Sequence, residues 1–246
     1  MSVPKIIHSL WIGPLPPPDK WMKTWRVKNP DWEYVYWDNK KVYSRTWQNQ
    51  HLVDHYTNLA KQAMSFRSAR GITFTGEKAT LFAWHVIADI LRYEILYEYG
   101  GYMPGADTAC LKPLTGNVPW LSHDLYTVNT GHMHAHRQAT LEQTDPLYTL
   151  QMKRYAPENA SPILASSKKN PWLKTIITEL GKKTELGEAV DTTGNVFMGE
   201  MLTKYPPENA LIVPYLKNKD RANTYSQHFS GTTKGSYRRG RTQHLW

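Results

Sequence analysis

Short apolar runs alternate along the chain with longer amphipathic segments. The apolar runs predict strands at residues 4–13, 32–39, 125–130, 162–167 and 210–216. A helix is predicted over residues 78–99, where apolar residues recur at helical spacing and two glycines follow: Ala79, Phe82, Ala83, Val86, Ile90, Tyr93 and Tyr97, then Gly100 and Gly101.

Other segments refine this pattern. Residues 170–183 predict an amphipathic helix with Asn170 as N-cap and Pro171 at its first position. Residues 43–65 predict an irregular helical region, and residues 13–21 are too rich in proline for regular structure. Alternating strands and helices favour an α/β fold. Since neither a repeat nor a linker divides the 246 residues, the sequence predicts a single domain over residues 1–246.

The cysteine content and the apolar runs indicate in which compartment the protein is expected. Cys110 is the only cysteine, so an intramolecular disulfide is excluded. The first residues, MSVPKIIHSLWIG, have no basic stretch and too short an apolar run for a signal peptide or anchor. No run approaches the ~18 apolar residues that a membrane span needs. We therefore expect a cytoplasmic location without stable membrane insertion.

The net charge of +9 is concentrated near the end of the chain. A cluster of this kind attracts polyanions such as nucleic acid, acidic lipid or nucleotide phosphates. A solvated basic tail is the alternative interpretation. The cluster consists of Lys217, Lys219, Arg221, Lys234, Arg238, Arg239 and Arg241.

Three groups of residues are candidates for chemistry. Asp89 and Arg92 share one face of the predicted helix, either as an ordinary ion pair or as a partly buried pair with a function. The segment HFSGTTK, residues 228–234, combines an imidazole, a glycine and a lysine that together can hold a phosphate and a metal. The segment GHMHAH, with His132, His134 and His136, is either a zinc site or an exposed loop.

Several segments together resemble glycosyltransferases with a DXD motif. The family includes yeast Golgi initiating mannosyltransferases and, more remotely, clostridial glucosylating toxins. The matching segments are PKIIHSLWIG, NPDWEYVYWD, ADILRYEILYEYGG and DTACLKPL. HFSGTTK also resembles the HxxGxxK signature of glycogenin-like transferases.

The resemblance implies a fold and a division of the chain. The fold is GT-A, a Rossmann-like α/β domain that binds a nucleotide sugar on a mostly parallel central sheet, with ligands at the carboxyl ends of the strands. The donor-binding half would cover about residues 1–114. The acceptor half would cover about residues 115–246.

The resemblance also implies roles for individual residues. Trp11 would stack on the base or ribose of the donor, and Ile7 and His8 would line that pocket. Asp107 and His228 would bind Mn²⁺ or Mg²⁺. Asp89 and Arg92 would bind the hydroxyls of the donor sugar, and Gly105 and Ala106 would make further contacts with the donor. The diphosphate would be bound by Ser230, Gly231 and Lys234. On the opposite side of the sugar ring would lie Asp191 and Asn195.

One departure from the family pattern affects the metal site. Where the family has Asp-x-Asp, this chain has Gly105-Ala106-Asp107, so the first carboxylate is missing. Oxygen-rich sites suit Mg²⁺ and Mn²⁺, and water can fill vacant positions. Three explanations remain open: an active enzyme with altered donor choice, a weak metal site assisted by His228, or an inactive relative.

The resulting hypothesis is a retaining glycosyltransferase that uses a UDP- or GDP-sugar. Its acceptor would be a glycan or surface polymer, or hydroxymethylated DNA, which the net charge, the arginine-rich end and the many aromatics suggest. The alternative is a non-catalytic protein that binds a nucleotide sugar or nucleic acid and has lost the first Asp of its motif.

Overall fold

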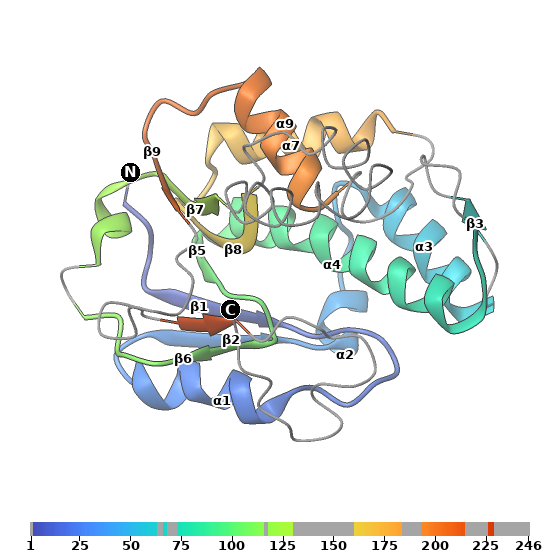
Figure 1. The fold of residues 1–246 in the computed structure, drawn as a ribbon, viewed down its shortest axis with the longest axis horizontal. Helices are drawn as coiled ribbons and strands as arrows, with labels where there is room; N and C mark the ends of the chain where they lie inside the picture. Colours follow the sequence, from blue (N-terminus) through green and yellow to red (C-terminus); the bar gives the residue numbers. More distant parts are fainter. Residues whose placement is uncertain are drawn as a thin grey trace, which may run out of the picture.

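The computed structural model describes residues 2–62, 66–67, 73–115, 118–129, 160–183, 193–214 and 226–228. At its centre is a six-stranded sheet with the strand order β2-β1-β5-β8-β7-β9 (Figure 1). Only β8 in this sheet runs against the others, so the predicted α/β fold with a mostly parallel sheet is confirmed. The strands are β1 (Ile6–Leu10), β2 (Glu33–Trp37), β5 (Gly101–Met103), β7 (Leu125–Asn129), β8 (Ala160–Ser166) and β9 (Ala210–Pro214).

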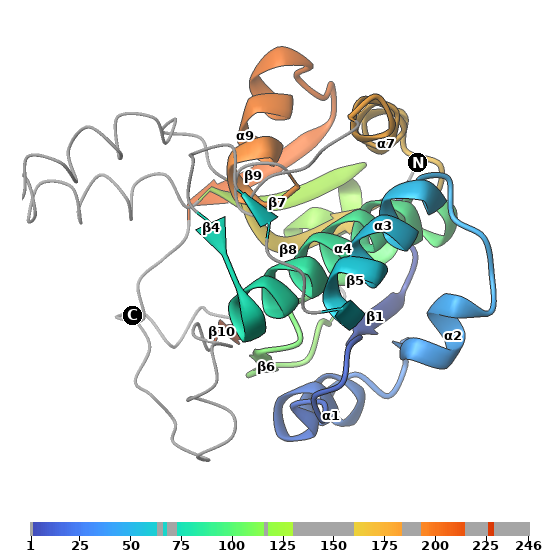
Figure 2. The same cartoon turned by 90° about the vertical axis from the view of Figure 1, so that its right-hand side faces the viewer.

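Helices lie on both faces of the sheet (Figures 1 and 2). Helix α1 (Asp19–Lys28) covers one face, beside a small antiparallel pair formed by β6 (Thr108–Cys110) and β10 (Ser226–His228). The other face is covered by α3 (Gln50–Gln62), α4 (Gly76–Tyr99), α7 (Pro171–Gly181) and α9 (Asn195–Lys204). The short elements are α2 (Asn39–Tyr43), β3 (Phe66–Arg67), β4 (Thr73–Phe74) and the 3-10 helix at Pro119–Ser122.

Two hydrophobic cores hold these layers together. The larger core lies between the sheet and α4, and includes Ile87, Ile90 and Leu91, which are fully buried. The smaller core lies under α1, where Ile7 meets Trp25. Because side chains on α4 are buried by the sheet on one side and by α3 and α7 on the other, this helix is apolar over most of its length.

The structure corrects several predicted elements. Regular structure begins inside the proline-rich segment, because α1 starts at Asp19 directly after Pro18. The predicted helical region at residues 43–65 is divided into α2, which ends at Tyr43, and α3, which begins at Gln50. The sequence interpretation missed β5, β6 and α9. Strands of three residues are too short to show a period, and α9 lacks a side-chain hydrogen bond at its N-cap Gly194.

Candidate functional site

Loops that follow β1 and β5 approach the middle of α4. In open α/β sheets, ligands bind at the carboxyl ends of the strands. The loop after β1 is fixed by Asn39, whose side chain accepts from Gly13 N at 2.9 Å and donates to Gly13 O at 3.0 Å. Gly13 has φ +103°, and a Cβ there would lie 3.1 Å from the ring of Trp84 on α4. A glycine therefore lets the loop that carries Trp11 rest on α4.

Asp89 and Arg92 form an ion pair on α4. Arg92 Nη1 donates to Asp89 Oδ1 at 2.8 Å, and the two side chains are 14% and 15% exposed. Burial raises the pKa of Asp89, whereas the nearby charges of Arg92 and His85 and the hydrogen bonds from Thr193 and Arg92 lower it. The pair is thus largely buried, which agrees with the interpretation of a partly buried pair rather than an ordinary surface ion pair.

Thr193 joins a distant part of the chain to this ion pair. Its hydroxyl donates to Asp89 Oδ2 at 3.1 Å, and its carbonyl accepts from the Tyr93 hydroxyl at 2.5 Å. Thr193 is fully buried. Both carboxylate oxygens of Asp89 are consequently held, one by Arg92 and the other by Thr193. The sequence interpretation missed the roles of Thr193 and Tyr93, although Thr193 lies between Asp191 and Asn195, which the family resemblance had assigned to the site.

The turn between β5 and β6 contains the incomplete motif. Asp107, the remaining carboxylate of the motif, is only 9% exposed. A Cβ added to Gly105 would lie 2.8 Å from Asp107 Oδ1 and 3.2 Å from Thr108 Oγ1. Within the described residues, the buried Thr108 hydroxyl has no hydrogen-bond partner. Two oxygens therefore face the space that a side chain at position 105 would enter.

Strand β10 brings His228 to the same turn. The antiparallel pairing of β10 with β6 places His228 opposite Thr108, although 120 positions separate the two residues in the sequence. His228 is thereby aligned with the residue that follows Asp107. The family resemblance had implied that Asp107 and His228 bind one cation, but nothing in the sequence indicated that β10 would pair with β6.

His85 is a further residue near the motif that the sequence interpretation missed. It lies one helical turn before Asp89 on α4, and its ring contacts Phe82 edge to face. Its pKa is lowered, chiefly because surrounding protein desolvates the ring, while the carboxylates of Asp89 and Asp107 act in the opposite direction. His85 is nevertheless an exposed residue of α4. The spacing of four to Asp89 was the signal available in the sequence.

Two residues expected to line the donor pocket are interior instead. Ile7 is fully buried against α1. His8 is also buried; its Nε2 lies 2.8 Å from Gly100 O, and its Nδ1 accepts from Trp37 Nε1 at 3.0 Å. These hydrogen bonds assign the neutral Nε2–H tautomer, and burial lowers the pKa of His8 to about 4. The assignment of Ile7 and His8 to the pocket is therefore corrected: they support the sheet.

The remaining predicted residues divide into two groups. Trp11 is partly buried, and its indole N–H donates to Leu15 O at 2.7 Å, which fixes the ring. Asn195 is the first residue of α9, two positions after Thr193. Outside the described residues lie Asp191, Ser230, Gly231, Lys234, the three histidines His132, His134 and His136, and the arginines Arg238, Arg239 and Arg241.

The residues at the Gly105 turn fit a divalent cation. Asp107 offers a carboxylate, and Thr108 offers a buried hydroxyl that lacks a partner in the described chain. Oxygen ligands of this kind suit Mg²⁺ and Mn²⁺. Within the described residues, no cluster of three or more His, Cys, Asp or Glu side chains could hold a metal, so these oxygens would have to be supplemented.

A family model matches residues 18–127, which include α4 and the Gly105–Asp107 turn. Its description is "Glycosyltransferase sugar-binding region containing DXD motif". The predicted resemblance to these glycosyltransferases is confirmed. The enzyme class that it implies, glycosyltransferase, is confirmed with it, and the matched region lies mostly within the predicted donor half.

One solved glycosyltransferase structure shares the fold. "PaToxG Glycosyltransferase" is 15% identical, with a TM-score of 0.50, and the match covers 84% of this chain and 71% of that one. The catalytic domain of alpha-toxin from Clostridium novyi is 11% identical, with a TM-score of 0.34 over 85% of this chain and 65% of that domain. The first likeness shows the fold alone, and the second is too low to support an argument.

Two negative findings accompany these matches. No curated protein matches the sequence significantly. In the part of the chain that the structure describes, no helix is long and apolar enough to cross a membrane.

Proposed function

We propose that this glycosyltransferase transfers a sugar from a nucleotide-sugar donor, with retention of the anomeric configuration. The observation that carries the proposal is the alignment of His228 with Thr108, because it joins the two predicted metal-binding segments at one turn. The Asp89–Arg92 pair on α4 supports a neighbouring position for the sugar.

In the proposed site, different residues bind the sugar, the nucleotide, the diphosphate and the cation. Asp89 accepts hydrogen bonds from sugar hydroxyls, and Arg92 donates to Asp89 and opposes its protonation. Trp11 stacks on the nucleotide, while Ser230, Gly231 and Lys234 bind the diphosphate. Asp107, Thr108 and His228 would hold Mn²⁺ or Mg²⁺. A divalent cation there supplies positive charge opposite the leaving diphosphate, as in other metal-assisted transfers.

Retention would follow from attack on the face of the sugar that the leaving diphosphate occupies. Lys234 stabilises the negative charge of that leaving group, and a protein nucleophile is not required. Asp191 and Asn195 would lie on the opposite side of the ring. The contact of Thr193 with Asp89 supports this placement, because it holds the segment between them against α4.

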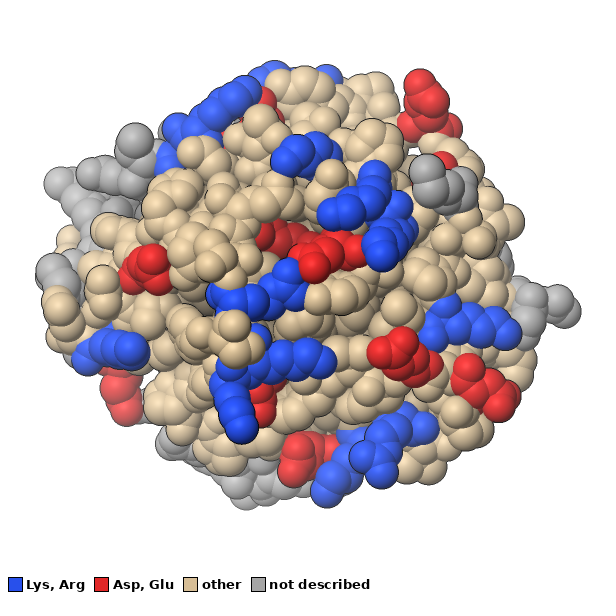
Figure 3. Space-filling model, turned by 180° about the vertical axis from the view of Figure 1, so that it is seen from behind, with Lys and Arg blue, Asp and Glu red and all other residues tan. Residues whose placement is uncertain are grey.

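For the acceptor, we propose a glycan or surface polymer rather than hydroxymethylated DNA. Figure 3 shows Lys and Arg side chains interspersed with Asp and Glu side chains on one face of the molecule. Among the described residues on that face, no continuous basic track runs across the surface. A duplex-binding protein would present such a track to the phosphates.

The test is hydrolysis of UDP-glucose, UDP-N-acetylglucosamine and GDP-mannose with Mn²⁺, with and without acceptors that include hydroxymethylated DNA. We expect one donor to be hydrolysed by the wild type and not by Asp107→Ala. Asp124→Ala, at a carboxylate directly before β7 and outside the proposed site, is the control and should keep activity. Unchanged hydrolysis by Asp107→Ala would contradict the assignment, and transfer to DNA would overturn the proposed acceptor class.

A further inference from the structure

We propose that Thr193 is a positioning residue that orients the carboxylate of Asp89 toward the donor sugar, and that Tyr93 holds Thr193 in place. This inference rests on the proposed function, in which Asp89 binds sugar hydroxyls. It concerns how the second half of the chain sets the geometry of a residue in the donor half.

The three hydrogen bonds form a continuous path. The Tyr93 hydroxyl donates to the Thr193 carbonyl, the Thr193 hydroxyl donates to Asp89 Oδ2, and Arg92 Nη1 donates to Asp89 Oδ1. A carboxylate held through both oxygens has one orientation, and its remaining lone pairs point in fixed directions. Without Thr193, the bond from Arg92 would be the only one left to this carboxylate among the described residues, and the carboxylate could rotate.

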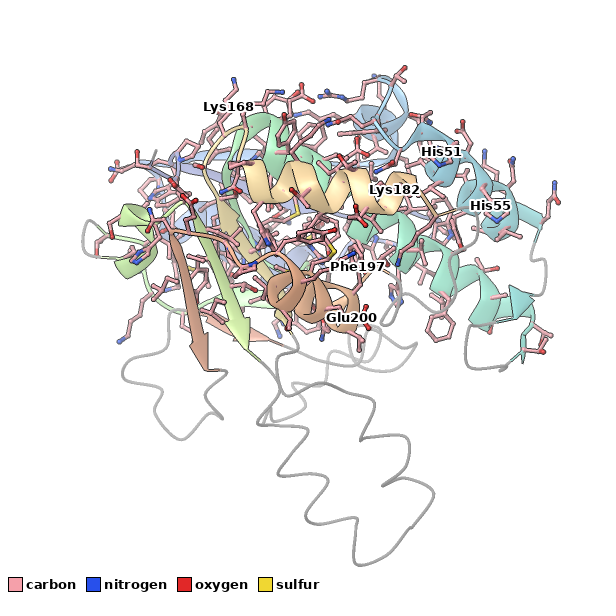
Figure 4. The ribbon with its side chains drawn as sticks, turned by 90° about the horizontal axis from the view of Figure 1, so that it is seen from above. His51, His55, Lys168, Lys182, Phe197 and Glu200 are labelled. Atoms are coloured by element: carbon pink, nitrogen blue, oxygen red, sulfur yellow. The ribbon has the colours of Figure 1, made fainter. Side chains whose placement is uncertain are left out.

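The Tyr93 side chain, where this path of hydrogen bonds begins, is held in place by packing. Tyr93 is buried on α4, and its ring meets that of Phe197 on α9 with centroids 6.5 Å apart. Figure 4 shows Phe197 on α9, which lies beside α7. Phe197 is only four residues after Thr193, so the aromatic contact and the hydrogen bond anchor the same segment to α4 at two points. Thr193 itself is fully buried and therefore has little freedom to move.

The arrangement also opposes protonation of Asp89, whose pKa is raised by burial. Burial favours the neutral carboxyl, and a neutral carboxyl would lose an acceptor for sugar hydroxyls. Arg92 and His85 on α4 provide the opposing charges, and Thr193 provides a hydrogen bond from a different element. Thr193 is thus the contact to Asp89 that does not depend on α4.

We expect a loss of binding affinity that affects the intact nucleotide sugar and not the nucleoside diphosphate. Asp89 is assigned to the sugar and not to the nucleotide, so Thr193→Val should weaken binding of the intact donor and leave binding of the nucleoside diphosphate unchanged. We expect about a tenfold rise in Kd for UDP-glucose, typical for loss of a hydrogen bond to a charged group, with Kd for UDP unchanged. If the panel above identifies a GDP-sugar as donor, GDP-mannose and GDP replace these probes.

The experiment measures both Kd values by calorimetry for Thr193→Val, Thr193→Ser, Tyr93→Phe and Asp89→Asn. Thr193→Ser keeps the hydroxyl and should restore donor binding, while Tyr93→Phe keeps the ring contact with Phe197 and should show a smaller loss than Thr193→Val. The matched control is Thr57→Val, since the Thr57 hydroxyl lies 2.7 Å from the Tyr43 hydroxyl in a similar pair elsewhere. It should change thermal stability but not the ratio of the two Kd values.

The outcomes separate the two proposals. If Asp89→Asn changes the ratio and Thr193→Val does not, the positioning role of Thr193 is overturned while the proposed function stands. If Thr193→Val weakens donor and diphosphate equally, or Thr193→Ser fails to restore donor binding, Thr193 is structural only. If Asp89→Asn leaves the ratio unchanged, or if none of the nucleotide sugars binds, the assignment of Asp89 in the proposed function is itself wrong.

Discussion

The turn at Gly105 shows how one residue changes the metal site. With no side chain at position 105, Asp107 Oδ1 and Thr108 Oγ1 approach the space that a first Asp would enter. The loss of that Asp lowers the negative charge of the site by one and leaves a neutral hydroxyl nearby. Metal affinity in oxygen-rich sites rises with the number of charged ligands. Restoring the carboxylate is therefore a direct test.

We predict that Gly105→Asp raises Mn²⁺ affinity about tenfold relative to Gly105→Ala. Both variants add a Cβ 2.8 Å from Asp107 Oδ1, so in both the carboxylate must rotate away. Only the first adds a ligand, and Gly105→Ala is thus the steric control. Electron paramagnetic resonance titration of free Mn²⁺, without donor, measures the difference. Equal affinities in the two variants would place the cation elsewhere.

The buried side chain of His8 makes the stability of the protein depend on pH. Burial lowers its pKa from 6.5 to about 4, so between these values the unfolded chain binds a proton that the folded chain does not. The folded state is then fully stabilised above pH 6.5 and loses up to ~3 kcal/mol as the pH falls toward 4. The raised pKa values of Asp89 and Glu94 act in the opposite direction.

A comparison of variants isolates His8 from the carboxyl groups. We predict that His8→Gln, whose amide can replace both hydrogen bonds, loses less stability between pH 7 and pH 4.5 than the wild type. Urea denaturation at the two pH values measures this difference. A variant with the same pH dependence as the wild type would show that His8 does not remain neutral in the folded protein.

Among the elements, α4 connects the site to the surrounding helices. Its residue Glu94 is buried and accepts hydrogen bonds from the backbone N–H groups of Gln48, at 2.5 Å, and Asn49, at 2.8 Å. These amides lie directly before α3, so Glu94 satisfies donors at the start of that helix. One helix thus caps another, although the two residues that it holds are more than 40 positions away in the sequence.

We predict that Glu94→Gln destabilises the protein by about 1–3 kcal/mol, because an amide N–H would face a backbone donor in a buried position. Hydrogen exchange should accelerate first at the amides of α3. Asp54→Asn, at an exposed residue on α3 that accepts from Gln50 Nε2, is the control and should have little effect. Exchange that accelerates uniformly over all helices would refute a local capping role.

At the scale of the whole molecule, two segments of the second half return to the donor half. Helices α7 and α9 lie over the face of the sheet that α4 covers, and β10 pairs with β6. The division into a donor half and an acceptor half stays a prediction, and so does the single domain over residues 1–246. The net charge of +9 is also a property of the entire chain.

Replacing Arg238, Arg239 and Arg241 by glutamine tests the acceptor class. Because the proposed acceptor is a glycan or surface polymer, we predict that the salt dependence of DNA binding does not change, whereas arginines that contact DNA phosphates would make the log–log slope flatter by roughly three units. Donor hydrolysis should stay near the wild-type rate, because the proposed donor contacts do not include these arginines. Fluorescence anisotropy with duplex DNA at several salt concentrations measures the slope. Lower donor affinity with an unchanged slope would instead mean that the arginines contact the diphosphate.

Elements with local signals could be predicted from the sequence alone. Helical spacing predicted α4, Asn170 and Pro171 predicted the start of α7, and strong apolar runs predicted five strands of the sheet. The structure confirms that the Asn170 side chain accepts from Trp172 N and Leu173 N. The motifs ADILRYEILYEYGG and DTACLKPL were enough to indicate the family resemblance, because the residues of each motif are consecutive in the sequence.

Only the tertiary structure decided which side chains meet. The alignment of His228 with Thr108 and the bond from Thr193 to Asp89 join segments more than 100 positions apart, and spacing in the sequence holds no information about such contacts. Burial was hidden for the same reason. His8 is a polar residue within an apolar run and Asp107 follows a glycine-containing turn, yet both side chains are buried. A residue's neighbours across strands, rather than its neighbours along the chain, determine whether it faces a ligand or the core.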